Sequence, residues 1–391
     1  MQKNSTGRKN RKQKRAAEVK QASGQASKSR KRKAEQLGEL TIGLDLGDKT
    51  SCYCVLDEQG AVSMERRVET TKKGLTQAFG RLARSRIGLE VGTHSPWVSR
   101  LLKSFGHEVI VANARQVKLI TQSNRKNDQL DAKTLARLAR IDPELLRPIQ
   151  HRSEEGQQDL LRIRVRAALV EARTALINSA RGLAKALGER LPKCAADRAD
   201  VECLQELPAA LQSSLQPLLE EVASLSNQIQ ACDEQIEQIA RSKYPETQLL
   251  KQVSGVGTLI ALTFVLTVED ASRFRKSRDV GCYVGLCPKQ RDSGERQPQL
   301  GISKEGDGYL RKLLVQGAHC ILGRRGADTD LKRWGAKLCA RGGKNARKRA
   351  VVAVARKLGI LLHRLWVTGE VYEPLRHAHA HSGAPAKRKA A

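Results

Sequence analysis

The chain has 391 residues, and its 71 lysines and arginines against 41 acidic residues give a formal net charge of +30. An apolar content of 40% is enough for packed cores, and no apolar run is long enough to cross a membrane. Nine cysteines without framework spacing suit a reducing cytosol. The charge predicts a polyanionic partner, and because aromatic residues make up only 3%, phosphate contacts should supply most of the affinity.

Composition divides the chain into five segments. Residues 1–37 carry a net charge of +11 and almost no large apolar residues, so a tail over 1–38 should be disordered in isolation. This tail is interpreted as a sequence-independent nucleic-acid arm, with a solubilising extension as the alternative. The other predicted segments are an α/β domain (39–150), a helical coiled-coil region (151–245), a mainly helical domain (246–375) and a second basic tail (376–391).

The α/β domain is predicted from the alternation of apolar and polar residues. Strands are expected at 40–46, 51–56, 61–68, 87–91 and 108–112, and helices at 72–84, 96–105 and 128–140. Three meandering strands followed by alternating helices and strands indicate a mixed sheet. Cys52 and Cys54 share one face of a strand and are expected in the core rather than on a metal.

Two long helices are predicted in the middle of the chain. Apolar positions recur at alternating spacings of three and four from Leu160 through Thr174 to Ile177, and again from Leu218 to Ile239. The second run spans three heptads, which favours an antiparallel coiled-coil hairpin that acts as a spacer or in self-association. Two ordinary core helices are the alternative.

Four carboxylates of the α/β domain form the first candidate site. Asp45 and Glu90 each lie in a short apolar strand, where an unpaired charge is costly unless it faces a cleft, a metal or a partner. Asp128 and Asp131 are three residues apart at the start of a helix and therefore share one face. Such a cluster needs cations, and Mg²⁺ fits best because it takes carboxylate and phosphate oxygens. Taken singly, each residue also has an ordinary interpretation as a helix cap, a surface charge or a strand end.

Two segments of the α/β domain resemble known proteins. The segment from Ile42 to Thr50 (IGLDLGDKT) resembles the first strand of RuvC-like nucleases of the ribonuclease H type. The order of the four carboxylates, together with the segment from Arg125 to Lys133 (RKNDQLDAK), resembles the DEDD transposases of insertion sequences of the one-ten family. The resemblance covers about residues 40–375. It implies a RuvC-like domain, a coiled coil and a C-terminal transposase domain with a nucleophilic serine.

A polar loop in the C-terminal domain forms the second candidate site. Ser293 precedes a glycine among basic residues, but no histidine nearby activates it, so on its residues alone it is an ordinary loop serine. The segment 280–314 resembles the family's transposase domain, which implies that Ser293 attacks DNA, with Ser303 as the competing candidate. Asp292 departs from the family pattern, which often has a small or polar residue before the serine. Its negative charge would repel phosphate unless it contacts a metal or an arginine. The loop cations predicted to contact nucleic acid are Lys289, Arg291, Arg296 and Lys304.

A glycine-rich turn precedes that loop. The segment from Ser254 to Thr258 (SGVGT) lies between two apolar helices, as in a helix-hairpin-helix. Gly255 and Gly257 would let backbone amides approach a phosphate at a helix N-terminus. A plain turn between core helices is the alternative.

The favoured hypothesis is an enzyme, a DNA transposase or recombinase, in which the carboxylates hold Mg²⁺ and Ser293 forms a serine-linked DNA end. The resemblance further implies donor and target DNA as substrates and a structured bridge RNA that pairs with both. It also implies a homo-oligomer, dimer or tetramer, in the bacterial cytoplasm at the nucleoid, without a membrane partner. The alternatives are a Mg²⁺-dependent RuvC-like endonuclease that uses water, and a non-catalytic nucleic-acid-binding relative.

Deletion of residues 1–37 should leave DNA strand exchange intact, because this tail lies outside the candidate sites and contributes charge alone. At saturating DNA, the truncated protein is expected to exchange strands at the full-length rate, while its affinity for DNA falls at physiological salt. Loss of exchange at saturating DNA would contradict this prediction.

Overall fold

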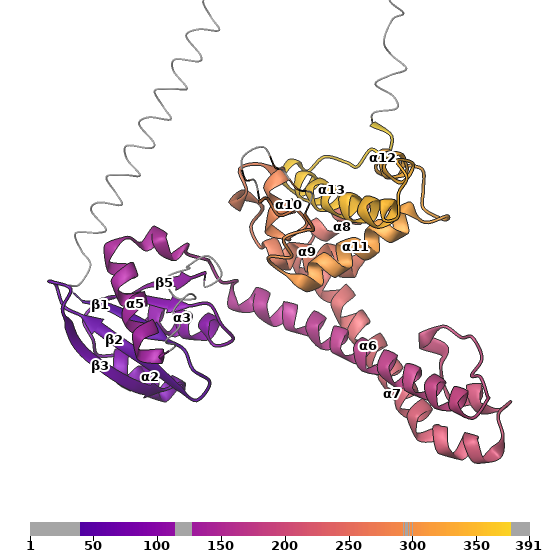
Figure 1. The fold of residues 1–391 in the computed structure, drawn as a ribbon, viewed down its shortest axis with the longest axis horizontal. Helices are drawn as coiled ribbons and strands as arrows, with labels where there is room; N and C mark the ends of the chain where they lie inside the picture. The colour runs from indigo at the N-terminus through magenta and orange to yellow at the C-terminus, as the bar shows by residue number, and fades with distance from the viewer. Residues whose placement is uncertain are drawn as a thin grey trace, which may run out of the picture. The chain divides into compact units, whose positions relative to one another are not determined.

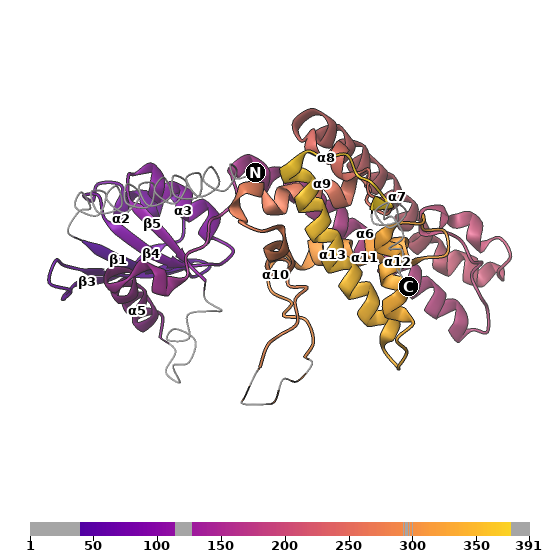
Figure 2. The same ribbon diagram turned by 90° about the horizontal axis from the view of Figure 1, so that it is seen from above.

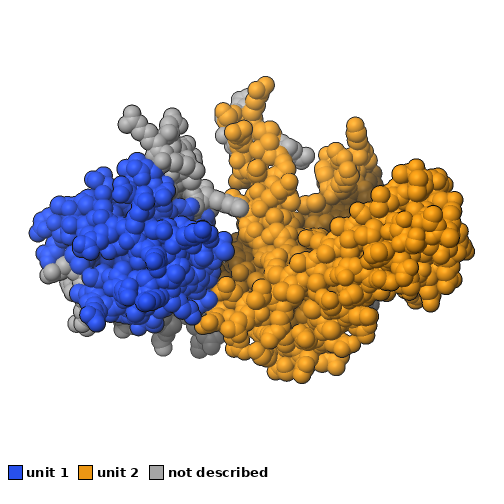
Figure 3. All heavy atoms as spheres, turned by 90° about the horizontal axis from the view of Figure 1, so that it is seen from below, with its two compact units in different colours: residues 1–151 blue, residues 152–391 orange. Residues whose placement is uncertain are grey.

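The computed structural model describes residues 40–113, 127–291, 293, 296, 298 and 300–376. The predicted N-terminal tail, nearly all of the C-terminal tail, Arg125 and Asp292 therefore lie outside the described residues. The chain divides into two compact units, residues 1–151 and 152–391 (Figure 3). The predicted middle and C-terminal segments thus share the second unit. No described helix is both long and apolar enough to span a membrane.

The first unit is built on a five-stranded mixed sheet (Figure 1). Its strands are β1 (Thr41–Asp45), β2 (Thr50–Leu56), β3 (Val62–Glu69), β4 (Arg86–Glu90) and β5 (Glu108–Ala112). The first three form an antiparallel meander, and β4 and β5 run parallel to β1, in the spatial order β3-β2-β1-β4-β5. The predicted mixed sheet is confirmed, with strand ends shifted by at most one residue.

Helices cover both faces of this sheet. On one face, α2 (Lys72–Phe79) and α3 (Ser95–Ser104) pack against alternate apolar residues of β1 and β4. On the other face, α5 (Asp128–Ile141) packs against β1, β2 and β4 and buries Cys52 and Cys54, as predicted. The predicted helix 72–84 was wrong at its end, because the α2 helix stops at Phe79 and the following residues turn toward β4.

The second unit begins with two long helices, α6 (Glu154–Ala186) and α7 (Ala209–Lys243). They lie antiparallel, since the start of α6 contacts the end of α7: Glu155 pairs with Lys243 at 2.7 Å, and Arg166 pairs with Asp233 at 2.8 Å. The antiparallel pairing agrees with the sequence, but Thr174 in the predicted apolar seam is exposed. A coiled-coil supercoil stays a prediction.

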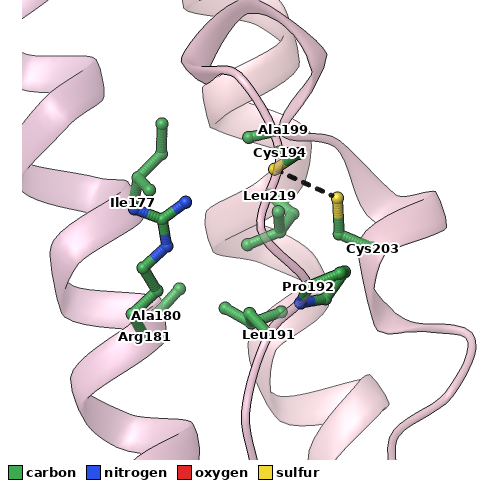
Figure 4. A pocket seen from close by; sticks show the side chains of 9 residues that line it. All are labelled: Ile177, Ala180, Arg181, Leu191, Pro192, Cys194, Ala199, Cys203 and Leu219. Carbon is green, nitrogen blue, oxygen red and sulfur yellow. Dashed lines mark hydrogen bonds between the residues drawn. The ribbon is translucent and has the colours of Figure 1, made fainter.

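The connection between α6 and α7 closes over a small apolar core (Figure 4). Leu191 and Pro192 point from the connecting segment toward Ala180 and Leu219 of the two helices. The thiol of Cys203 lies 3.6 Å from that of Cys194. The cavity that remains has a volume of about 10 Å³, room for one water, so this end of the hairpin is packing and not a ligand site.

The rest of the second unit is helical, as predicted. Its central helix, α9 (Thr258–Val268), is buried on nearly every side from Ile260 onward. The helices around it are α8 (Glu246–Leu250), α10 (Val280–Tyr283), α11 (Gly308–Leu322), α12 (Asp330–Cys339) and α13 (Ala346–Thr368). Short 3-10 turns occur at Pro143–Leu146 in the first unit and at Ala196–Arg198, Val201–Leu204, Ala271–Arg273 and Ser277–Asp279 in the second.

Candidate functional site

The sheet places Asp45 and Glu90 side by side. They are the last residues of the parallel neighbours β1 and β4, one step beyond the paired residues Leu44 and Leu89. Both leucines are buried on the face that α2 and α3 cover. Because side chains alternate along a strand, both carboxylates point to the opposite face, toward α5.

Two glycines let α5 lie directly on these strands. A Cβ atom on Gly43 would lie 1.9 Å from the carbonyl oxygen of Ala132, and one on Gly88 would lie 3.1 Å from the Cβ of Ala139. Any side chain at Gly43 would therefore force the helix away. The apolar strand pattern of the sequence did not assign this role to Gly43.

The first turn of α5 carries the other two carboxylates. Asn127 caps the helix, its side chain accepting a hydrogen bond of 3.1 Å from the backbone amide of Gln129. Asp128 is exposed and Asp131 is half-buried, and both stand where the helix dipole favours negative charge. The helix cap, the alternative interpretation of Asp128, is thus filled by Asn127, which leaves Asp128 available for another role.

The four carboxylates share one electrostatic environment. Burial, followed by the negative charges of Asp128, Asp131 and Glu90, raises the pKa of Asp45 to about 6. Asp45 forms no ion pair with any described residue. The charges of the other three residues selected from the sequence therefore act on Asp45, so the four lie in one region of the first unit.

The donor set suits a hard cation. All four side chains offer carboxylate oxygens, and their mutual repulsion at Asp45 is what a bound cation relieves. Within the residues that the structure describes, no three His, Cys, Asp or Glu side chains converge closely enough to hold one ion. This is compatible with Mg²⁺, which takes one or two protein carboxylates and completes its shell with water and phosphate oxygens.

The sequence patterns did not point to the polar residues of the loop that follows β4. His94 lies 3.4 Å from Asp48, which follows β1, and accepts a hydrogen bond at Nδ1 from the indole N–H of Trp97. Because an indole only donates, the neutral ring carries its proton on Nε2, facing Asp48. Ser95 contacts His151 at 2.9 Å. The position of this loop in the sequence could have indicated it, because loops at the carboxyl ends of adjacent parallel strands gather at one sheet edge.

Ser293 lies near the end of a narrow two-stranded hairpin, here called the serine hairpin, formed by the described residues from 287 to 303. Ser293 and Arg296 exchange backbone hydrogen bonds of 3.2 and 3.1 Å, and Lys289 donates to Gly301 at 2.9 Å. Figure 2 shows the two arms of this hairpin running as coil away from α10. Ser293 is exposed, while the rival Ser303 lies half-buried at the foot of the hairpin. The predicted loop cations Lys289, Arg291, Arg296 and Lys304 are all exposed.

The foot of the serine hairpin is held tightly. Arg311 of α11 donates from one guanidinium nitrogen to the carbonyl oxygens of Val284, at 2.9 Å, and Glu305, at 2.7 Å. Gly285 and Gly306 both have a φ of +68°, and a Cβ atom on either would lie within 2.2 Å of a backbone oxygen. Arg311 therefore joins the two strands where they leave the helical body, a role that no sequence motif revealed.

The two glycines of the predicted helix-hairpin-helix differ. Gly255 has a φ of +86°, and its Cβ position lies 3.0 Å from the carbonyl oxygen of Gly317 on α11, so packing alone requires glycine there. Gly257 precedes α9, is exposed, and has no atom within 4 Å of its Cβ position. Only Gly257 has open space beside a helix N-terminus, where a phosphate would fit.

Two family models and several transposases are similar to this chain. A family model described as "Transposase", for DEDD proteins of the IS110 type, matches residues 42–188, and one described as "Transposase IS116/IS110/IS902 family" matches residues 247–334. The transposase for insertion sequence element IS1111A of Coxiella burnetii is 31% identical over 88% of this chain and 94% of that protein. A probable family 20 transposase of Pseudomonas aeruginosa is 29% identical over 85% of this chain and 98% of that protein.

The two family matches and the similarity to these transposases over most of the chain define an insertion-sequence transposase, an enzyme class that cuts and rejoins DNA. The chain belongs to the IS116/IS110/IS902 family.

Asp45→Asn should stabilise the metal-free protein at neutral pH. The raised pKa of Asp45 means that the folded state disfavours its ionised form, a penalty absent below pH 4 and complete above about pH 6. In EDTA at pH 7.5 we expect a gain of about 1 kcal/mol, discounted for partial exposure, or about 3 °C in Tm by scanning calorimetry. The gain in stability should shrink toward pH 4.5. An equal gain at pH 4.5 and pH 7.5 would contradict the raised pKa of Asp45.

Proposed function

We propose that this transposase cuts and rejoins DNA through a serine-linked intermediate, with Ser293 as the nucleophile. The observation that carries the proposal is the serine hairpin, which presents an exposed hydroxyl among exposed cations on a firmly held foot. A nucleophile that attacks a phosphate inside bulky DNA needs such exposure, and a defined position speeds the attack.

The chemical step conserves the phosphodiester bond energy. The Ser293 oxygen forms a bond to the scissile phosphorus and loses its proton, while the bond from phosphorus to one deoxyribose oxygen breaks and leaves a free hydroxyl. The negative charge of the transition state is stabilised by the side chains of Lys289, Arg291 and Arg296. Attack by a second DNA hydroxyl reverses the step and rejoins the strands without ATP.

We propose that Asp45, Glu90, Asp128 and Asp131 hold Mg²⁺. When bound, Mg²⁺ would supply positive charge to phosphate oxygens that the carboxylates alone would repel. The support is the raised pKa of Asp45, to which burial contributes most and the negative charges of Asp128, Asp131 and Glu90 contribute further. The role of these residues is to bind the ion and orient it at the sheet edge.

We also propose a bridge RNA and a homo-oligomer as partners. An RNA that pairs with donor and target DNA would read sequence, while the exposed cations hold backbones, consistent with a formal charge of +30. Self-association is supported by four leucine and valine side chains exposed on or just after α6. They are Leu161, Val165, Leu183 and Leu187. Of the other predicted RNA and DNA contacts, Gly257 and Lys304 fit by their exposure, and Gly255 has a packing role.

Hydrolysis by water is the second candidate mechanism, because an Asp45 with a pKa of about 6 can also accept a proton from a water molecule. The carboxylate cluster alone would then suffice for cleavage, and Ser293 would be dispensable. The two mechanisms leave different products, so one variant separates them.

Ser293→Ala should abolish both cleavage and strand exchange while leaving DNA affinity unchanged. The measurement uses donor and target DNA with the copurified RNA, and it detects a detergent-resistant protein–DNA adduct on a denaturing gel. Ser303→Ala, at the foot of the same hairpin, is the matched control and should keep the adduct. If Ser293→Ala still cuts DNA and leaves a 5′ phosphate, water is the nucleophile.

Arg311→Met should lower kcat for strand exchange about 100-fold with little change in DNA Kd, because a loosened foot misplaces Ser293 by about 1 Å or more. Arg311→Lys should recover part of the rate, since one ammonium group can still bind a carbonyl oxygen. Lys312→Met removes the neighbouring cation, which pairs with Glu171, and is expected to behave as wild type. An Arg311→Met protein with weaker DNA binding and normal kcat would show a role in binding, not positioning.

A further inference from the structure

A groove between α12 and α13 lies apart from the serine hairpin. It has a volume of about 540 Å³ and is closed on one side by residues 370–376, which follow α13. Its apolar wall includes Leu331 of α12 and Leu361 of α13. The volume falls within the usual range of small-molecule sites, roughly 300–1,000 Å³.

All three arginines that line this groove are already paired. Arg364 and Arg376 both contact Glu370, at 3.2 and 3.1 Å, and Arg333 contacts Asp328 at 2.6 Å. By contrast, Lys337 of α12 and Lys357 of α13 form no ion pair with any described residue. Five cations and the three carboxylates Asp330, Glu370 and Glu373 line the groove, so positive charge is in excess. The two ammonium groups outside these ion pairs are the ones that an anion would meet.

An aromatic ring lies beside these cations. Trp334 lines the groove half-buried, and the Nζ atom of Lys357 stands 3.9 Å from the centre of its ring. Partial burial lowers the pKa of Lys357, so the folded protein disfavours its charge until an anion arrives. The ammonium group lies over one face of the ring, so a base can stack there only when Lys357 turns from the ring to a phosphate. An aromatic ring and an adjoining ammonium group thus match the two parts of a nucleotide, a base and a phosphate.

We infer that the α12–α13 groove binds an unpaired nucleotide of a single-stranded nucleic acid, with its base against Trp334 and its phosphate between Lys337 and Lys357. A base inside a duplex is stacked on both faces and paired along one edge, so it cannot place its face on Trp334 without leaving the duplex. An acidic peptide would meet the cations but would make no use of the ring. The inference extends the nucleic-acid binding of the family to a particular site and is independent of the serine chemistry.

The test uses the fluorescence of Trp334 in the full-length protein. Trp97→Phe and Trp366→Phe leave it as the single tryptophan, and the protein is titrated with oligothymidylate, oligouridylate, duplex DNA of equal length and polyglutamate. Both single strands should quench the emission saturably, and the tighter of the two identifies DNA or RNA as the source. Duplex DNA and polyglutamate should leave the emission unchanged.

Charge variants complete the test. Lys337→Gln/Lys357→Gln should weaken quenching and reduce the salt dependence of binding, log K against log salt, by about 1.4, as expected for two lost phosphate contacts. Lys185→Gln/Lys193→Gln, which removes two exposed lysines at the far end of the α6–α7 pair, should quench as the parent does. Unchanged emission with single strands, equal quenching by duplex or polyglutamate, or full quenching in the groove variant would overturn the inference. Ser293→Ala should bind normally, so a failed groove would not count against the serine mechanism.

Discussion

The contact of α5 with β1 through Gly43 is the constraint on which the carboxylate cluster depends. Because the backbone of α5 occupies the space where a side chain would stand, the first turn of α5 comes close to the end of β1. That places Asp128 and Asp131 near Asp45, and their charges oppose its ionisation. The packing energy of the apolar sheet and helix thus maintains an arrangement of acids that electrostatics alone would separate.

In the second unit, close packing and hydrogen bonds hold the foot of the serine hairpin. An exposed hairpin is mobile unless its foot is fixed, and here one guanidinium group and two glycines in the left-handed region fix it. The next residues lead into α11, whose cap Asp307 receives two backbone hydrogen bonds and pairs with Arg164 of α6. The foot is therefore connected through α11 to α6, one of the two long helices of the unit. This contact with the helical body restrains the position of the hairpin.

Much of the first unit was predictable because alternation along strands is a strong signal. Asp45 and Glu90 stood out as charges in apolar strands, and the spacing of Asp128 and Asp131 placed them on one helix face. The roles of Gly43 and Arg311 were not predictable, since each depends on a partner distant in the sequence. The role of Gly255 was not predictable for the same reason, because a glycine in a phosphate-binding pattern can be required by packing against another helix.

The four candidate carboxylates and the cations of the serine hairpin lie in different units of the chain. Asp45 has no ion pair among the described residues, and the hairpin cations are exposed on another unit. If a lysine stood within ion-pair distance of Asp45, its charge would lower the pKa and occupy the oxygens that a metal ion needs. In the proposed mechanism, the carboxylates bind a metal ion and the hairpin cations bind phosphate. The two sets carry opposite charges, so a direct ion pair between them would oppose both roles.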